Sequence, residues 1–79
     1  MTTIWTIDRI KMTKEKPQTF SVMAEATLAA RKRLEGWMEK GDRTETTRIE
    51  DEDGKARYEM YVMMPDCSLL DFAVLIVED

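Results

Sequence analysis

The stretch LLDFAVLIVE at residues 69–78 decides the fold of this 79-residue chain. Every position from Phe72 to Val77 is apolar, so both faces of an extended strand would be apolar there. Such a pattern is typical of a strand at the buried centre of a sheet. The sequence predicts a single substantial helix, which covers one face only. We therefore expect a second copy of the chain, in a homodimer, or another partner on the other face.

Upstream, RIEDEDGKARYEM at residues 48–60 predicts a β-hairpin. Asp53-Gly54 is a strong signal for a two-residue turn with positive φ at both positions. This turn sets a register that pairs opposite charges on one face and largely apolar residues on the other. The expected charged pairs are Glu52–Lys55, Glu50–Arg57 and Arg48–Glu59, and the expected pairs on the other face are Ile49–Tyr58 and Thr47–Met60.

The segment Thr27–Lys40 predicts the helix, with Thr27 as its cap and Gly41 as its C-terminal stop. A helix that begins nearer Phe20 is the alternative, because SVMAEATLAA is also compatible with helix. The apolar residues at helical spacing are Ala30, Leu34, Trp37 and Met38.

The N-terminal part of the chain predicts two antiparallel strands. The first is Ile4–Met12, which is rich in β-branched residues, and the second is Gln18–Glu25, where apolar and polar residues alternate. TKEKPQ between them contains Pro17 and predicts a turn. The whole chain, residues 1–79, is thus expected to be one α+β domain with element order β-β-α-β-β-β and an antiparallel sheet of about five strands.

Charge and composition narrow the classes of partner. Sixteen acids against twelve bases give a net charge of −4. A direct contact with nucleic acid is not expected, because it usually needs a basic surface, whereas an acidic chain is attracted to basic protein surfaces. The N-terminus lacks the features of a signal peptide, and no apolar run reaches the length of a membrane span. With Cys67 as the single cysteine, these features predict a cytoplasmic protein without a membrane contact.

No motif for catalysis, cofactor binding or metal binding is present in the sequence. There is no histidine to activate Cys67 as a nucleophile. The acids at 50–53 lack the spacing of a calcium loop, and the three glycines do not form a phosphate-binding loop. We expect a protein that is not an enzyme and that has no cofactor and no metal.

Two groups of residues are candidates for partner binding. One is the acidic run of the hairpin, which is either the solvated face of a structural hairpin or a surface that meets basic groups on a partner. The other is an apolar extension of the charged hairpin face, on the side away from Met60 and Val62. The candidate residues are Glu50, Asp51, Glu52 and Asp53 in the first group, and Tyr61 and Met63 in the second.

The layout of the chain resembles that of small phage-encoded inhibitors, anti-CRISPR proteins among them. A strand pair leads into a helix through FSVMAEATLAARKRLEGWM, and a hairpin and a final strand follow. The resemblance rests on size, acidic charge, low cysteine content and element order, and it transfers no site residue. It implies a stoichiometric inhibitor that blocks a host nucleic-acid-binding complex by occupying a basic surface.

Two functions are therefore expected from the sequence. The first is a protein-binding inhibitor or regulator that uses its acidic surface on a host protein or ribonucleoprotein complex. The alternative is a structural or assembly subunit that forms a homodimer through its sheet. Salt separates them, because an acidic contact weakens as salt rises and an apolar sheet contact does not.

Overall fold

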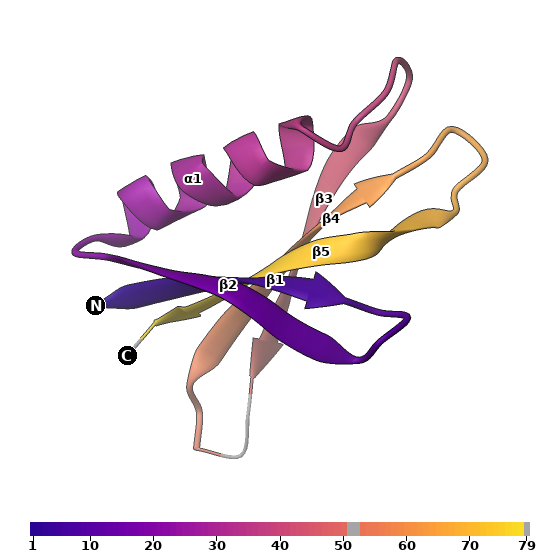
Figure 1. The fold of residues 1–79 in the computed structure, drawn as a ribbon. Helices are drawn as coiled ribbons and strands as arrows, with labels where there is room; N and C mark the ends of the chain where they lie inside the picture. The colour runs from indigo at the N-terminus through magenta and orange to yellow at the C-terminus, as the bar shows by residue number, and fades with distance from the viewer. Residues whose placement is uncertain (51–52, 79) are drawn as a thin grey trace.

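The computed structural model describes residues 1–50 and 53–78, and it shows one antiparallel sheet with one helix across one of its faces (Figure 1). The strand order is β2-β1-β5-β4-β3, so the apolar C-terminal strand lies at the centre. The predicted α+β class and element order are confirmed. No helix in the described ranges is long and apolar enough to cross a membrane. The elements are β1 (Thr2–Asp8), β2 (Thr13–Phe20), α1 (Met23–Glu35), β3 (Arg43–Glu50), β4 (Ala56–Met63) and β5 (Leu69–Glu78).

The core lies between α1 and the sheet. Along β5, alternate residues point to opposite faces, and Val74 and Ile76 point toward the helix. Their neighbours in the sheet are Ile4 on β1 and Met60 on β4, so three adjacent strands supply the floor of the core. The buried cluster consists of Ile4, Ala26, Ala30, Leu34, Met60, Val62, Val74 and Ile76.

The helix begins earlier than Thr27 and ends before Lys40, so the predicted bounds are wrong at both ends. Its N-cap is Val22, without a side-chain cap, and the Thr27 hydroxyl lies inside the helix and donates to the Met23 carbonyl at 2.9 Å. The alternative start nearer Phe20 is the better prediction. The helix ends at Gly36, where low helix propensity favours termination. Of the expected apolar stripe, Ala30 and Leu34 are buried helical residues, whereas Trp37 and Met38 follow the helix and pack against the core.

The predicted bounds of the first two strands are also wrong. The first strand ends at Asp8, and TKEKPQ belongs to β2 instead of forming a turn. Pro17 is tolerated because β2 is an edge strand, where one side of the backbone needs no partner. The register between β1 and β2 also shifts between Ile4 and Thr6, so the regular strand pairing is interrupted near Pro17.

The β3–β4 hairpin differs from its predicted register by one residue. Glu50 pairs with Ala56, and Arg48 pairs with Tyr58, which is not the register that a two-residue turn at Asp53-Gly54 would set. The positive φ of Gly54, 76°, agrees with the expected turn character at that position. The expected pairs Glu50–Arg57 and Arg48–Glu59 do not form, and Glu52–Lys55 lies partly outside the described residues.

The physical reason for this shift lies in the central strands. Pairing of Met60 with Val74 fixes which residues of β4 face the helix. In contrast, β3 is an edge strand composed mainly of Thr and charged residues, so its own hydrophobic pattern specifies the register weakly. As a result, Ile49 lies on the face away from the helix, where 43% of its surface is exposed.

Candidate functional site

The face of the sheet away from α1 is the candidate site, and we call it the open face. No described element covers it, as the ribbon shows (Figure 1). Strand register and side-chain alternation place its residues. The open face comprises Lys14 and Thr19 of β2, Thr3, Trp5 and Ile7 of β1, Ala73, Leu75 and Val77 of β5, Arg57, Glu59, Tyr61 and Met63 of β4, and Arg43, Glu45, Thr47 and Ile49 of β3.

The centre of the open face is apolar. Trp5 pairs with Leu75, and Ile7 pairs with Ala73, which in turn pairs with Tyr61. Ala73 is fully buried, and the four larger side chains around it are half-buried. This explains why β5 is apolar on both faces: one face packs under the helix, and the other forms the centre of the open face.

Long cationic side chains partly cover this apolar centre. The Arg9 guanidinium donates to a Glu59 carboxylate oxygen and lies 5.7 Å from the centroid of the Tyr61 ring. The Lys14 ammonium lies 5.1 Å from the centroid of the Trp5 ring. Both contacts place a positive charge near the face of an aromatic ring. The open face therefore carries aromatic and cationic groups together, a combination that is common in protein interfaces.

The open face is not predominantly acidic. Both signs of charge occur on β3 and β4, and further bases lie at the end of β1 and on β2. The bases are Arg9, Lys14, Arg43 and Arg57, and the acids are Glu45 and Glu59.

The structure separates the two predicted groups of partner-binding residues. Tyr61 and Met63 lie on the open face, away from Met60 and Val62, as expected. Glu50 lies at the other end of the hairpin and forms an ion pair with Arg48 at 2.6 Å. At that end of the hairpin lie the described acids Glu50 and Asp53, which we call the acidic loop. Because the eight residues of β4 span about 23 Å, the acidic loop and Met63 do not form one compact site.

Of the remaining acidic candidates, Asp53 is exposed in the loop, and Asp51 and Glu52 lie outside the described residues. Two hydrogen bonds raise the pKa of Arg48 above its usual value. The bond to Tyr58 has the larger effect, and the bond to Glu50 has the smaller one. The strand register places Glu50 on the helix side of β3, whereas its expected partner Arg57 lies on the open face.

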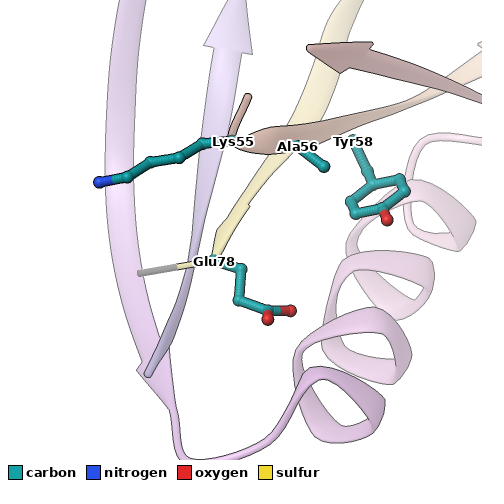
Figure 2. Close-up of a pocket in the computed structure, with 4 residues that line it drawn as sticks. All are labelled: Lys55, Ala56, Tyr58 and Glu78. Carbon is teal, nitrogen blue, oxygen red and sulfur yellow. The ribbon is translucent and has the colours of Figure 1, made fainter. Parts of the chain in front are cut away.

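A groove lies on the helix side of the sheet, between the start of α1 and strands β3 and β4. One part of it has a volume of about 290 Å³ and is lined by Met23, Thr27, Arg31, Thr46, Tyr58, Met60, Ile76 and Glu78. A neighbouring hollow of about 240 Å³ is lined by Lys55, Ala56, Tyr58 and Glu78. Figure 2 shows the Tyr58 ring and the Glu78 carboxylate on the side of the helix, while Lys55 points away from them.

The groove and the neighbouring hollow are lined by hydroxyl, cationic and carboxylate groups. These are the hydroxyls of Thr27, Thr46 and Tyr58, the side chains of Arg31 and Lys55, and the Glu78 carboxylate. Within residues 1–50 and 53–78, no three metal-ligating side chains converge on one point. The open face is therefore the stronger candidate, since it has an extended apolar centre with aromatic and charged groups.

Sequence reasoning missed Trp5, Ile7 and Arg9 as members of the site. Their alternation with buried Ile4, Thr6 and Asp8 was a usable signal, because it places Trp5 and Ile7 on the face opposite the core. The contact of Arg9 with Glu59 had no local signal.

Comparisons of the chain with protein-family models, with curated proteins and with solved structures gave no match.

Proposed function

We propose that this chain is a non-enzymatic protein-binding module that docks through the open face of its sheet, and that it forms a homodimer through this face when no other partner is present. The observation that carries the proposal is the apolar centre formed by Trp5, Ile7, Leu75 and Tyr61 on a face that no described element covers. In a fold of one helix packed on one face of a sheet, the uncovered face gains stability when a second protein surface excludes water from it.

The size of the open face limits the area that a contact can bury. Five strands about 4.8 Å apart and about eight residues long give a face of roughly 600 Å². Two such faces bury about 1,200 Å² together, which is the lower limit for a specific and stable interface. Full burial of a large apolar side chain contributes about 1.5–3 kcal/mol, and half-buried side chains gain a part of this. We therefore expect a reversible dimer with a dissociation constant in the micromolar range.

The charges on the open face are compatible with a second copy as the occupant. A two-fold axis brings the same surface of both copies together, so a self-binding face needs both signs of charge. Arg43 and Glu45 lie on β3, and Arg57 and Glu59 lie on β4, so both signs are present in each of the two strands. A surface of one sign would repel its own copy.

The two tryptophans provide an internal test of this proposal. Trp5 lies on the open face, whereas Trp37 packs against Phe72 on the helix side, with 5.6 Å between the ring centroids. In ¹H–¹⁵N spectra recorded at rising protein concentration, the Trp5 indole signal is expected to shift and the Trp37 signal to stay. Shifts of Trp37 without Trp5, or no concentration dependence at all, would contradict docking through the open face.

A second candidate is the predicted inhibitor that occupies a basic site on a host complex, as the anti-CRISPR-like layout implies. The observation that favours it is the gathering of acids at one end of the sheet. Glu78 at the end of β5 lines the same hollow as Lys55 from the acidic loop, and Glu50 and Asp53 are exposed there. Such a contact would use a different surface from the open face.

Charge reversal tests this second candidate. Replacing Glu50 and Asp53 by Lys is expected to release a basic host partner at low salt and to leave the fold intact, because both residues are exposed. If the proteins captured from host lysate are the same for the wild type and the reversed variant, the acidic loop does not act as the contact.

A further inference from the structure

The turn between β1 and β2 presents an apolar tip to solvent. Ile10 is 73% exposed and Met12 is 85% exposed, which makes them the two most exposed large hydrophobic residues in the described part of the chain. Neither residue belongs to the core cluster or to the centre of the open face. Their exposure therefore has no explanation in the packing of the fold.

This tip is held in place by the buried carboxylate of Asp8. Its Oδ1 atom accepts hydrogen bonds from the backbone N–H groups of Ile10, at 3.0 Å, and Lys11, at 3.1 Å. Asp8 also pairs with Thr13 across the hairpin, so strands flank the turn on both sides. The two apolar side chains are thus displayed by an ordered turn.

Positive charge surrounds the tip. Residues 8–16, DRIKMTKEK, contain four bases and two acids and carry a net charge of +2, whereas the whole chain carries −4. Arg9 is paired with Glu59, so the lysines are the bases that face solvent at the tip. Lys11, Lys14 and Lys16 are exposed. The end of β3 and the start of β4 lie at the opposite end of the sheet from this turn, with the exposed acids Glu50 and Asp53, as the strand register shows.

We propose that the β1–β2 tip docks on an anionic lipid surface, with Ile10 and Met12 inserted among the acyl chains and the lysines near the headgroups. Two aliphatic side chains on a convex tip enter a fluid bilayer without a shaped pocket, which a protein partner would have to provide. Lysines attract anionic lipids without a fixed geometry, and repulsion of the acidic loop orients the tip toward the membrane. This surface goes beyond the proposed function. The expectation of no membrane contact rested on the lack of a spanning segment, and surface docking needs none.

Vesicle flotation tests this proposal on the full chain. The protein is expected to float with vesicles of phosphatidylcholine and phosphatidylserine at low salt, and to remain unbound with phosphatidylcholine alone. The double variant Ile10→Ser/Met12→Ser is expected to lose binding by about tenfold or more, and Lys11→Glu by a similar factor. The matched controls are Leu28→Ser, an exposed apolar residue on the helix, and Lys40→Glu, which changes the net charge equally.

The outcomes separate lipid docking from other uses of the tip. Loss of binding in the tip variants but not in the controls supports docking, provided that circular dichroism shows all variants folded. Absence of binding to anionic vesicles would overturn the proposal. Equal binding by Ile10→Ser/Met12→Ser would also overturn it, because charge alone would then explain the attraction. Binding to duplex DNA that is lost in the tip variants, without binding to vesicles, would assign the tip to nucleic acid instead.

Discussion

Arg9 and Glu59 form an ion pair across the open face although they lie 50 positions apart in the sequence. The contact connects the end of β1 with β4 and passes over the central strand, where Ala73 is fully buried. The ion pair therefore depends on the strand order β1-β5-β4, which brings Arg9 and Glu59 to the same face of the sheet.

Replacing Arg9 by Ala is expected to lower the free energy of unfolding by about 0.5–1.5 kcal/mol. The variant loses a partly buried ion pair with Glu59 and the contact with the Tyr61 ring. Urea denaturation measures the change, with Lys40→Ala as the control at an exposed loop position. A variant with the two charges exchanged, Arg9→Glu/Glu59→Arg, should recover part of the loss. Equal stability of Arg9→Ala and the wild type would show that the pair is only a surface contact.

Two glycines near the end of the helix provide a matched pair of substitutions. Gly41 has a φ of +93°, and an added Cβ would lie 3.1 Å from the Pro65 Cγ atom, so Gly41→Ala is expected to destabilise the fold by about 1 kcal/mol. Gly36 has a φ of −65°, and its added Cβ meets the Arg33 carbonyl at 3.4 Å. Gly36→Ala is therefore expected to be neutral or stabilising by up to about 1 kcal/mol. Thermal unfolding compares the two variants, and the reverse order of stability would contradict the backbone conformations described here.

The turn after β4 should show a pH dependence that arises from Asp66. Its carboxylate accepts hydrogen bonds from the hydroxyl and the backbone N–H of Ser68, and these bonds lower the pKa of Asp66 below its ordinary value of 3.8. A lowered carboxyl pKa stabilises the folded state above the unfolded pKa, and this stabilisation is lost as the pH falls through the folded pKa. NMR titration of the Asp66 side chain should show the pKa rising toward 3.8 in Ser68→Ala. An unchanged pKa in that variant would contradict the role of the hydroxyl.

The sequence predicted the fold class because its strongest patterns are also the central ones. The apolar run from Phe72 to Val77 specified a buried strand, and Ala30 and Leu34 specified the helix face that packs on it. An apolar run and an apolar helix face have to be buried in any compact fold, so these patterns identify the core elements without knowledge of the strand order. The expected uncovered face of β5 also agrees with the position of Leu75 and Val77 on the open face.

The errors lie at the two edges of the sheet, where packing constrains the sequence least. Pro17 indicated a turn, yet an edge strand tolerates a proline. Asp53-Gly54 indicated a two-residue turn, but the pairing of β4 with β5 determines which residues of β4 face the helix. The polar strand β3 has little hydrophobic pattern of its own, so it pairs in the register that differs from the prediction by one residue. The pairing of Arg9 with Glu59 depends on the strand order β1-β5-β4, which no local pattern encodes.

Sedimentation equilibrium across the micromolar range tests the central claim most directly, namely that a second copy covers the open face. Wild-type protein should rise from 9.2 kDa toward twice that mass as its concentration increases. Leu75→Lys should stay at the monomer mass and remain folded, because the new lysine lies opposite Glu59. Leu28→Lys, with the same change of charge on the exposed side of the helix, should behave like the wild type. A wild-type mass that stays at 9.2 kDa at every concentration would contradict the account.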